Sequence, residues 1–189
     1  MKSSFRKVSK MVVLSLLNAS PLRGQNIIKA PRGYAPQIGT LVAMLEDLRA
    51  RVARSVVHLT PTETDFLLDE KANRIGALIL HLAATEKYYQ VYTFEDRGFN
   101  AAEEEKWETA LNLGPAARKQ IQGQPISYYL EIWAEVRAET LALLKTKDDA
   151  WLAAKVKVGN MNNHWAWYHV MEHQANHMGQ LRLIIKRME

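Results

Sequence analysis

Apolar residues recur at three- and four-residue steps along this chain, and this spacing constrains the fold more than any other feature. Between residues 34 and 58, Ile38, Leu41, Val42, Leu45 and Leu48 follow it, which places them on one face of an α-helix. Three further long helical segments are expected at about residues 73–93, 126–145 and 162–187. The chain has only nine glycines and six prolines in 189 residues, which argues against a many-turned all-β fold. We therefore predict an all-α fold, a four-helix bundle.

Shorter elements are expected between the long ones. Residues 60–63 read Thr-Pro-Thr-Glu, a capping box with proline at the first helical position. A long connection links the second and third long helices, and its charged run Glu103–Lys106 should begin a short helix that ends near Leu111. Gly114-Pro115 and residues 123–125 are expected to be breaks. A brief helical turn is predicted around Trp151.

The N-terminal residues differ from the rest of the chain. Residues 1–24 hold five of the 25 Lys and Arg residues and no acid. Four of these charges precede a short apolar run at residues 11–17, which is the order of a secretory signal peptide. The alternative is a basic tail on a cytoplasmic protein, and we favour export. We divide the chain into a basic leader and linker, residues 1–33, and a helical domain, residues 34–189.

The overall charge excludes some classes of function. Without the leader, 20 basic residues balance 20 acidic ones, so the net charge of +5 does not indicate a nucleic-acid-binding surface. No apolar run approaches the ~18–20 residues that an integral membrane helix needs. The chain has no cysteine, which excludes thiolate metal ligands and a cysteine nucleophile.

Histidines carry the strongest indication of chemistry. His173 and His177 are four residues apart in the last helix, so both lie on one face and can bind one metal ion. An ordinary hydrogen-bonded cluster is the alternative. His81 lies on a half-apolar face of the second helix. Taken alone, a histidine in such a position is more often a core residue with its hydrogen bonds satisfied than a metal ligand. Joined to the pair, His81 becomes the natural third ligand of a site with open coordination positions.

Two further residues are candidates for contact with a substrate. Tyr88 lies two turns after His81, and its hydroxyl could reach the site, although simple packing at the end of the bundle is the alternative. His169 lies one turn before His173 and could be a fourth ligand, a hydrogen-bond donor to a ligand or a pocket wall. Trp165 and Trp167 are expected at the rim. The zincin motif His-Glu-x-x-His is absent, because Glu172 precedes His173 and points away from it.

Two segments resemble the DinB/YfiT-like family of helical-bundle metalloenzymes. One is Ile75–Glu86, IGALILHLAATE, with its single histidine. The other is Trp167–Gln180, WYHVMEHQANHMGQ, with the pattern Glu-His-x-x-x-His-x-Gly-Gln. The similarity of layout covers about residues 34–188, and the two motifs together are specific.

The resemblance implies a four-helix bundle that binds a divalent metal through His81, His173 and His177. Nickel, zinc and iron all suit a set of three imidazoles. Relatives include transferases and isomerases that use low-molecular-weight thiols, so we expect an enzyme that activates a thiol or water for transfer or hydrolysis. The alternative is a non-catalytic bundle that binds metal or a small molecule. A homodimer is compatible with a bundle of this kind, but no interface is visible in the sequence.

Overall fold

The computed structural model describes residues 26–188, and this part of the chain is all α-helical. It contains eight helices and no β-strand. The four long ones are α2 (Pro36–Val56), α4 (Ile75–Phe94), α7 (Ile126–Leu144) and α9 (Asn163–Met188). The four short ones are α3 (Pro61–Thr64), α5 (Ala101–Asn112), α6 (Gly114–Gln120) and α8 (Asp149–Ala153). The all-α bundle expected from the apolar spacing is confirmed.

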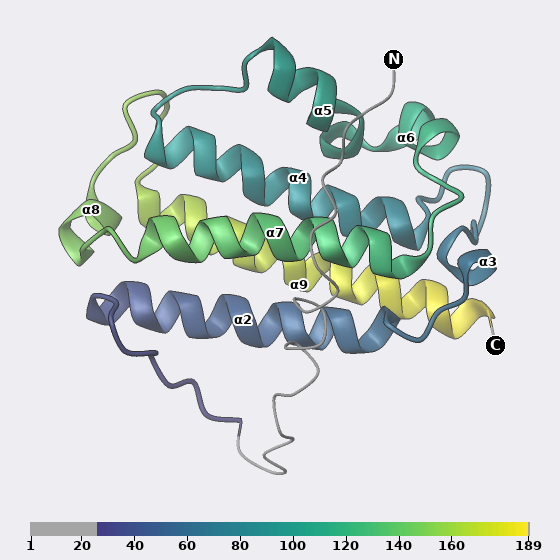
Figure 1. The fold of residues 1–189 in the computed structure, drawn as a ribbon, viewed down its shortest axis with the longest axis horizontal. Helices are drawn as coiled ribbons and strands as arrows, with labels where there is room; N and C mark the ends of the chain where they lie inside the picture. The colour runs from purple at the N-terminus through teal and green to yellow at the C-terminus, as the bar shows by residue number, and fades with distance from the viewer. Residues whose placement is uncertain (1–25, 189) are drawn as a thin grey trace.

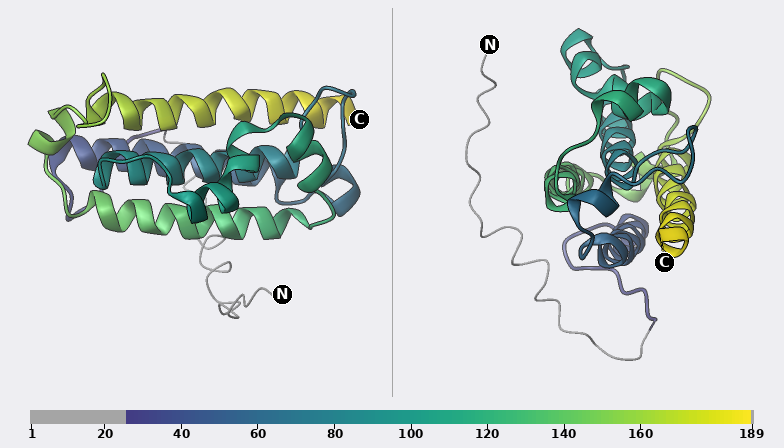
Figure 2. Two further views of the ribbon diagram at one scale, coloured as in Figure 1. Left: turned by 90° about the horizontal axis from the view of Figure 1, so that it is seen from above. Right: turned by 90° about the vertical axis from the view of Figure 1, so that its right-hand side faces the viewer.

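The long helices pack side by side around a common centre (Figure 1; Figure 2, right). Helix α4 packs against both α7 and α9, and α2 packs against α9 and more lightly against α7. Helices α5 and α6 cover α4 on the side away from α2 (Figure 1). Because α4 has neighbours on several sides, it is buried around most of its circumference, which explains its nearly continuous apolar sequence.

Helix α4 approaches α7 closely at one glycine. A Cβ at Gly76 would overlap the ring of Tyr129 on α7, so the absence of a side chain there allows Tyr129 to pack directly on the backbone of α4. The tyrosine is 1% exposed. This contact anchors the end of α4 from which His81 projects.

Most of the predicted helix ends agree with the structure to within two residues. The capping box at Thr60 is present, with Glu63 and Thr60 exchanging hydrogen bonds, and Asn162 caps α9 by accepting from the backbone N–H of Trp165 at 2.8 Å. The expectation for Gly114-Pro115 was incomplete, because helix α6 begins there. Leu113 and Gly114 both have positive φ and turn the chain, and Pro115 then suits the first turn of a helix.

Two other expectations have different outcomes. Trp167 was expected at the rim but is fully buried, because it faces the core beside Phe94. The signal-peptide interpretation concerns residues 1–24, which lie outside the described residues. Within residues 26–188, none of the helices has both the length and the apolar content required to cross a bilayer.

Candidate metal centre

Three imidazoles from two neighbouring helices meet at one point between α4 and α9. The Nε2 atom of His173 lies 2.9 Å from Nε2 of His81 and 3.0 Å from Nε2 of His177. The rings meet nearly edge to face, with interplanar angles of 62°, 81° and 79°. The three residues form a group whose ligand atoms all lie within 4.8 Å of one another. The structure thus brings together the three histidines singled out in the sequence.

The Nδ1 atoms of His81 and His177 face away from the centre, and each has a hydrogen-bond partner outside the cluster. Nδ1 of His81 donates to the backbone carbonyl of Ala110 in α5 at 2.9 Å. Nδ1 of His177 donates to the side-chain oxygen of Gln180 at 2.9 Å. A carbonyl oxygen can only accept, so the proton of each neutral ring sits on Nδ1 and the Nε2 lone pair points to the centre.

Burial keeps the rings neutral. Burial, with a smaller contribution from the nearby His177, lowers the pKa of His81 to about 4 and that of His173 to about 3. The pKa of His177 is also lowered, mainly by burial and against the hydrogen bond to Gln180. A histidine must be neutral to bind a metal, so all three are ready to act as ligands near pH 7.

This arrangement fits a metal ion better than it fits a closed hydrogen-bond network. Neutral His173 can place at most one proton on Nε2, yet that atom faces two nitrogens whose lone pairs point toward it. At least one contact therefore brings two lone pairs together, which a shared cation would relieve. Two nitrogens bound to one divalent metal at about 2.0–2.1 Å each lie about 3 Å apart, which matches the two separations measured from Nε2 of His173.

Neither Tyr88 nor His169 belongs to the three-histidine group. The Tyr88 ring stacks on Tyr92, with centroids 5.7 Å apart, and meets Phe99 edge to face at 5.3 Å. Burial, with a smaller contribution from Tyr92, raises the pKa of Tyr88. The His169 ring lies 5.9 Å from that of His173 and stacks on Trp165 at 5.2 Å. His169 thus adjoins the cluster, while Tyr88 lies farther along α4.

The sequence reasoning missed a second polar cluster, centred on Glu86. Its carboxylate is fully buried and accepts from the guanidinium of Arg137 at 2.6 and 2.8 Å. It also accepts from the Trp133 indole at 3.0 Å and the Thr140 hydroxyl at 2.6 Å. Burial alone would raise the pKa of Glu86, but the charge of Arg137 and these hydrogen bonds hold the pKa below its usual value. The available signal was that Leu82, Ala83 and Tyr89, three or four residues away on the same helix face, are apolar or aromatic.

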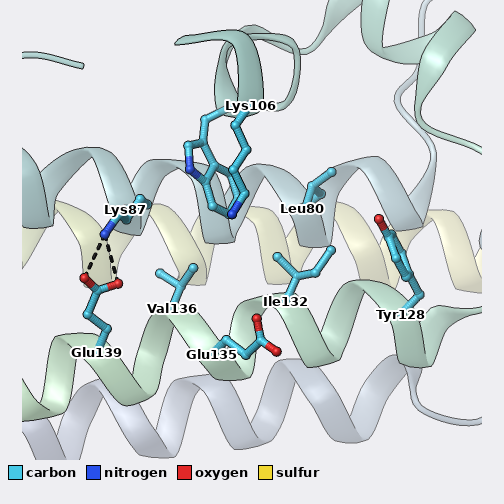
Figure 3. Close-up of a pocket in the computed structure, with 9 residues that line it drawn as sticks. Leu80, Lys87, Lys106, Tyr128, Ile132, Glu135, Val136 and Glu139 are labelled. Atoms are coloured by element: carbon cyan, nitrogen blue, oxygen red, sulfur yellow. Dashed lines mark hydrogen bonds and ion pairs between the residues drawn. The ribbon is translucent and has the colours of Figure 1, made fainter. Parts of the chain in front are cut away.

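A separate groove lies on the outer side of the bundle, between α4, α5 and α7 (Figure 3). It measures about 350 Å³, and Leu80, Ile132 and Val136 form its apolar floor. At one end Lys87 and Glu139 form an ion pair of 2.8 Å. Lys87 and Lys106 line its α4 and α5 side, and Glu135 and Glu139 line its α7 side, so the formal charges of the lining balance.

Comparison with known proteins supports the resemblance noted from the two motifs. The family model for mycothiol-S-transferase matches residues 40–188. This family lies within the DinB/YfiT-like superfamily of helical metalloenzymes, so the resemblance is confirmed. No curated protein matches the chain. The matched range covers α4, α7 and α9 in full and α2 from residue 40, and it includes every histidine of the cluster.

Proposed function

The chain belongs to the mycothiol-S-transferase family, and from this membership and the geometry of the site we propose that it is a metal-dependent thiol transferase. In this proposal, His81, His173 and His177 hold one divalent metal ion. The observation that carries the proposal is the convergence of three neutral imidazoles on one point. Nickel, zinc and iron remain the candidate metals, because all three accept imidazole ligands.

A divalent metal in such a site lowers the pKa of a bound thiol and so favours the thiolate nucleophile at neutral pH. The residues of the chain fix where this happens. Ala110 and Gln180 hold the His81 and His177 rings in place through their Nδ1 atoms. Helix α5 supplies the Ala110 carbonyl and therefore also shields one side of the centre.

The proposed substrate is a low-molecular-weight thiol, and the family name points to mycothiol. In the reaction, the thiol loses its proton to water, and its sulfur forms a bond to an electrophilic carbon as the leaving group departs with its electron pair. We place Tyr88 and His169 in contact with substrate. His169 lies beside the cluster, and Tyr88 lies farther along the face of α4 that leads from it.

The first test compares metal content and thiol transfer in the wild-type chain and in His173→Ala. His164→Ala is the matched control, because His164 lies in the same helix but is exposed. We expect about one divalent metal per wild-type chain and per control chain, and little in His173→Ala. Transfer from mycothiol to an alkylating electrophile should follow the metal content. A wild-type chain that binds no divalent metal without chelator present would refute the proposal.

Two other outcomes would assign the site differently. Metal binding that depends on His173, without reaction of either thiols or hydrolysable esters, would support the non-catalytic binding protein instead. Hydrolysis of esters without thiol transfer would show that the centre activates water. Both outcomes are measured on the same wild-type, His173→Ala and His164→Ala proteins.

The domain division and the export of the chain remain proposals of their own. The family match begins at residue 40, which agrees with a helical domain that starts near residue 34. The intact mass of the protein from its native host tests the leader. Loss of the residues before about Gln25 would support export, and a full-length mass in the cytosolic fraction would refute it.

A further inference from the structure

A row of aromatic rings leads away from the three histidines along the same two helices. On α9, Trp165 and His169 precede His173 at four-residue steps, and on α4 Tyr88, Tyr89 and Tyr92 follow His81. We call these five residues, Trp165, His169, Tyr88, Tyr89 and Tyr92, the aromatic track. The four-residue steps on α9 keep its rings on the face that carries the metal-binding histidines.

Ring contacts join the track to the cluster without interruption. His169 lies 5.9 Å from His173, and Trp165 stacks on His169 at 5.2 Å with an interplanar angle of 7°. Tyr89 meets His169 edge to face at 5.8 Å. All these distances are in the range of favourable aromatic pairs. The two helices therefore contribute rings to one continuous surface.

The track is open to solvent at its far end. Trp165 is 46% exposed, although an indole gains free energy from burial. A hollow of about 450 Å³ lies against this ring and is lined also by Asn160, Met161 and Asn162. The indole stacks on His169, and the backbone N–H of Trp165 donates to the side chain of Asn162. The protein thus presents a fixed aromatic face beside an open space.

From these contacts we propose that the aromatic track binds the second substrate, a planar and uncharged aromatic electrophile. None of its five residues carries a carboxylate, ammonium or guanidinium group, so stacking provides the recognition. This inference rests on the proposed thiol transfer, and it adds the acceptor class and the residues that bind it. Trp165 lies two helical turns, about 12 Å, from His173 along α9. The part of the track at His169, whose ring centroid is 5.9 Å from that of His173, would hold the electrophile within reach of a thiolate at the centre.

The reaction is balanced for a chloronitrobenzene acceptor. The thiolate sulfur forms a bond to the ring carbon that carries chlorine, the C–Cl bond breaks, and chloride leaves with the electron pair. The proton of the thiol goes to water. No oxidant or reductant is needed.

Binding can be measured without turnover. 1,3-Dinitrobenzene resembles the acceptor but has no leaving group, and the chain has no cysteine to react with it. Equilibrium dialysis of the full-length, metal-free protein should show binding that Trp165→Ala weakens by about 3–10-fold, the value of one aromatic stacking contact. Trp165→Phe should retain most of the binding. Tyr128→Ala is the matched control, because Tyr128 is 40% exposed and lines the separate groove of Figure 3.

Turnover then separates this inference from the proposed function. With 1-chloro-2,4-dinitrobenzene, Trp165→Ala should raise the KM for the electrophile and leave the KM for the thiol unchanged. With iodoacetamide, which has no ring, Trp165→Ala should lower kcat/KM by a smaller factor than it does with 1-chloro-2,4-dinitrobenzene. If dialysis shows the expected loss but no variant transfers thiol, the binding site stands and the proposed function fails.

Two results would overturn the inference. One is equal binding of 1,3-dinitrobenzene by wild type and Trp165→Ala, whether or not the protein transfers thiol. The other is loss of binding in Tyr128→Ala alone, which would place the ligand in the groove between α4, α5 and α7. A circular-dichroism spectrum of each variant shows that the comparison is made between folded proteins.

Discussion

Two polar sites share helix α4 and are built in opposite ways. At Glu86, a buried negative charge is met by the guanidinium of Arg137 and by neutral donors from α7, with a longer contact from Gln174 of α9 at 3.4 Å. At His81, three neutral rings turn their acceptor nitrogens toward one another. The protein completes the first site from its own side chains, whereas in our proposal a cation from outside completes the second.

This difference separates a structural site from a functional one. Burial of charge is tolerated only where the charge is paired and hydrogen-bonded, and the Glu86 cluster satisfies that condition. Burial of three imidazoles instead disfavours their protonated forms and keeps them as ligands. Both sites are polar and inward-facing on one helix, and only the pattern of donors and acceptors distinguishes them.

The largest expected effect tests the structural role of the Glu86 cluster. Glu86→Gln leaves Arg137 buried without its main counter-charge, and loss of one partner of a buried ion pair costs about 3–5 kcal/mol. Glu139→Gln is the control. It removes the other carboxylate that bridges α7 to α4, in an ion pair with Lys87 at 2.8 Å, but this carboxylate is exposed. We expect it to cost less than about 1 kcal/mol.

Urea unfolding followed by circular dichroism, with chelator in all samples, measures both free energies of unfolding. If Glu86→Gln costs no more than Glu139→Gln, the cluster is not a structural site and the comparison fails. Metal binding is measured on folded Glu86→Gln in separate samples without chelator or urea. If the variant still binds metal, the two sites are independent.

A second prediction concerns how the difference in unfolding free energy between wild type and Glu86→Gln depends on pH. The folded-state pKa of Glu86 lies below its usual value of 4.5. Its contribution to stability is therefore fully present above pH 4.5 and is lost as the pH falls below that value. The gap in unfolding free energy between wild type and Glu86→Gln should be constant from pH 7 to about pH 5 and should narrow toward pH 3. A gap that stays constant to pH 3 would contradict the assigned direction of the shift.

The smallest expected effect concerns the partner of His177. Gln180→Ala removes the acceptor that orients this ring, and loss of such an outer partner lowers metal affinity by about 10–100-fold. Gln180→Glu keeps an acceptor oxygen and should keep the affinity. Arg182→Ala, a change at an exposed position on the same helix, is the control. Competition with a chelating dye measures the affinity.

The stability of these variants sharpens the contrast with Glu86. Because Gln180 is exposed, Gln180→Ala should change the unfolding free energy of the metal-free protein by less than about 0.5 kcal/mol. Unaltered metal affinity in Gln180→Ala would show that the His177 ring is positioned by its packing alone.

Local patterns allowed much of the fold to be predicted. The apolar spacing located the four long helices, and the Thr60 capping box marked the start of α3. Helix α6 was missed because Gly114 and Pro115 indicate a break, and in this chain the same pair both ends one helix and begins the next. The burial of Trp167 was also missed, although steps of three and then four residues lead from it to Val170 and Gln174, which are buried, and place it on the inner face of α9.

The sequence by itself determined that His173 and His177 share a helix face, because four-residue spacing in an α-helix depends only on local geometry. Tertiary structure decided everything that joins separate helices. His81 meets His173 across 92 positions of sequence, and Ala110 of α5 holds the far side of its ring. Glu86 looks like an exposed acid until Arg137 is packed against it. Such contacts depend on which helices become neighbours, and helical periodicity carries no information about that.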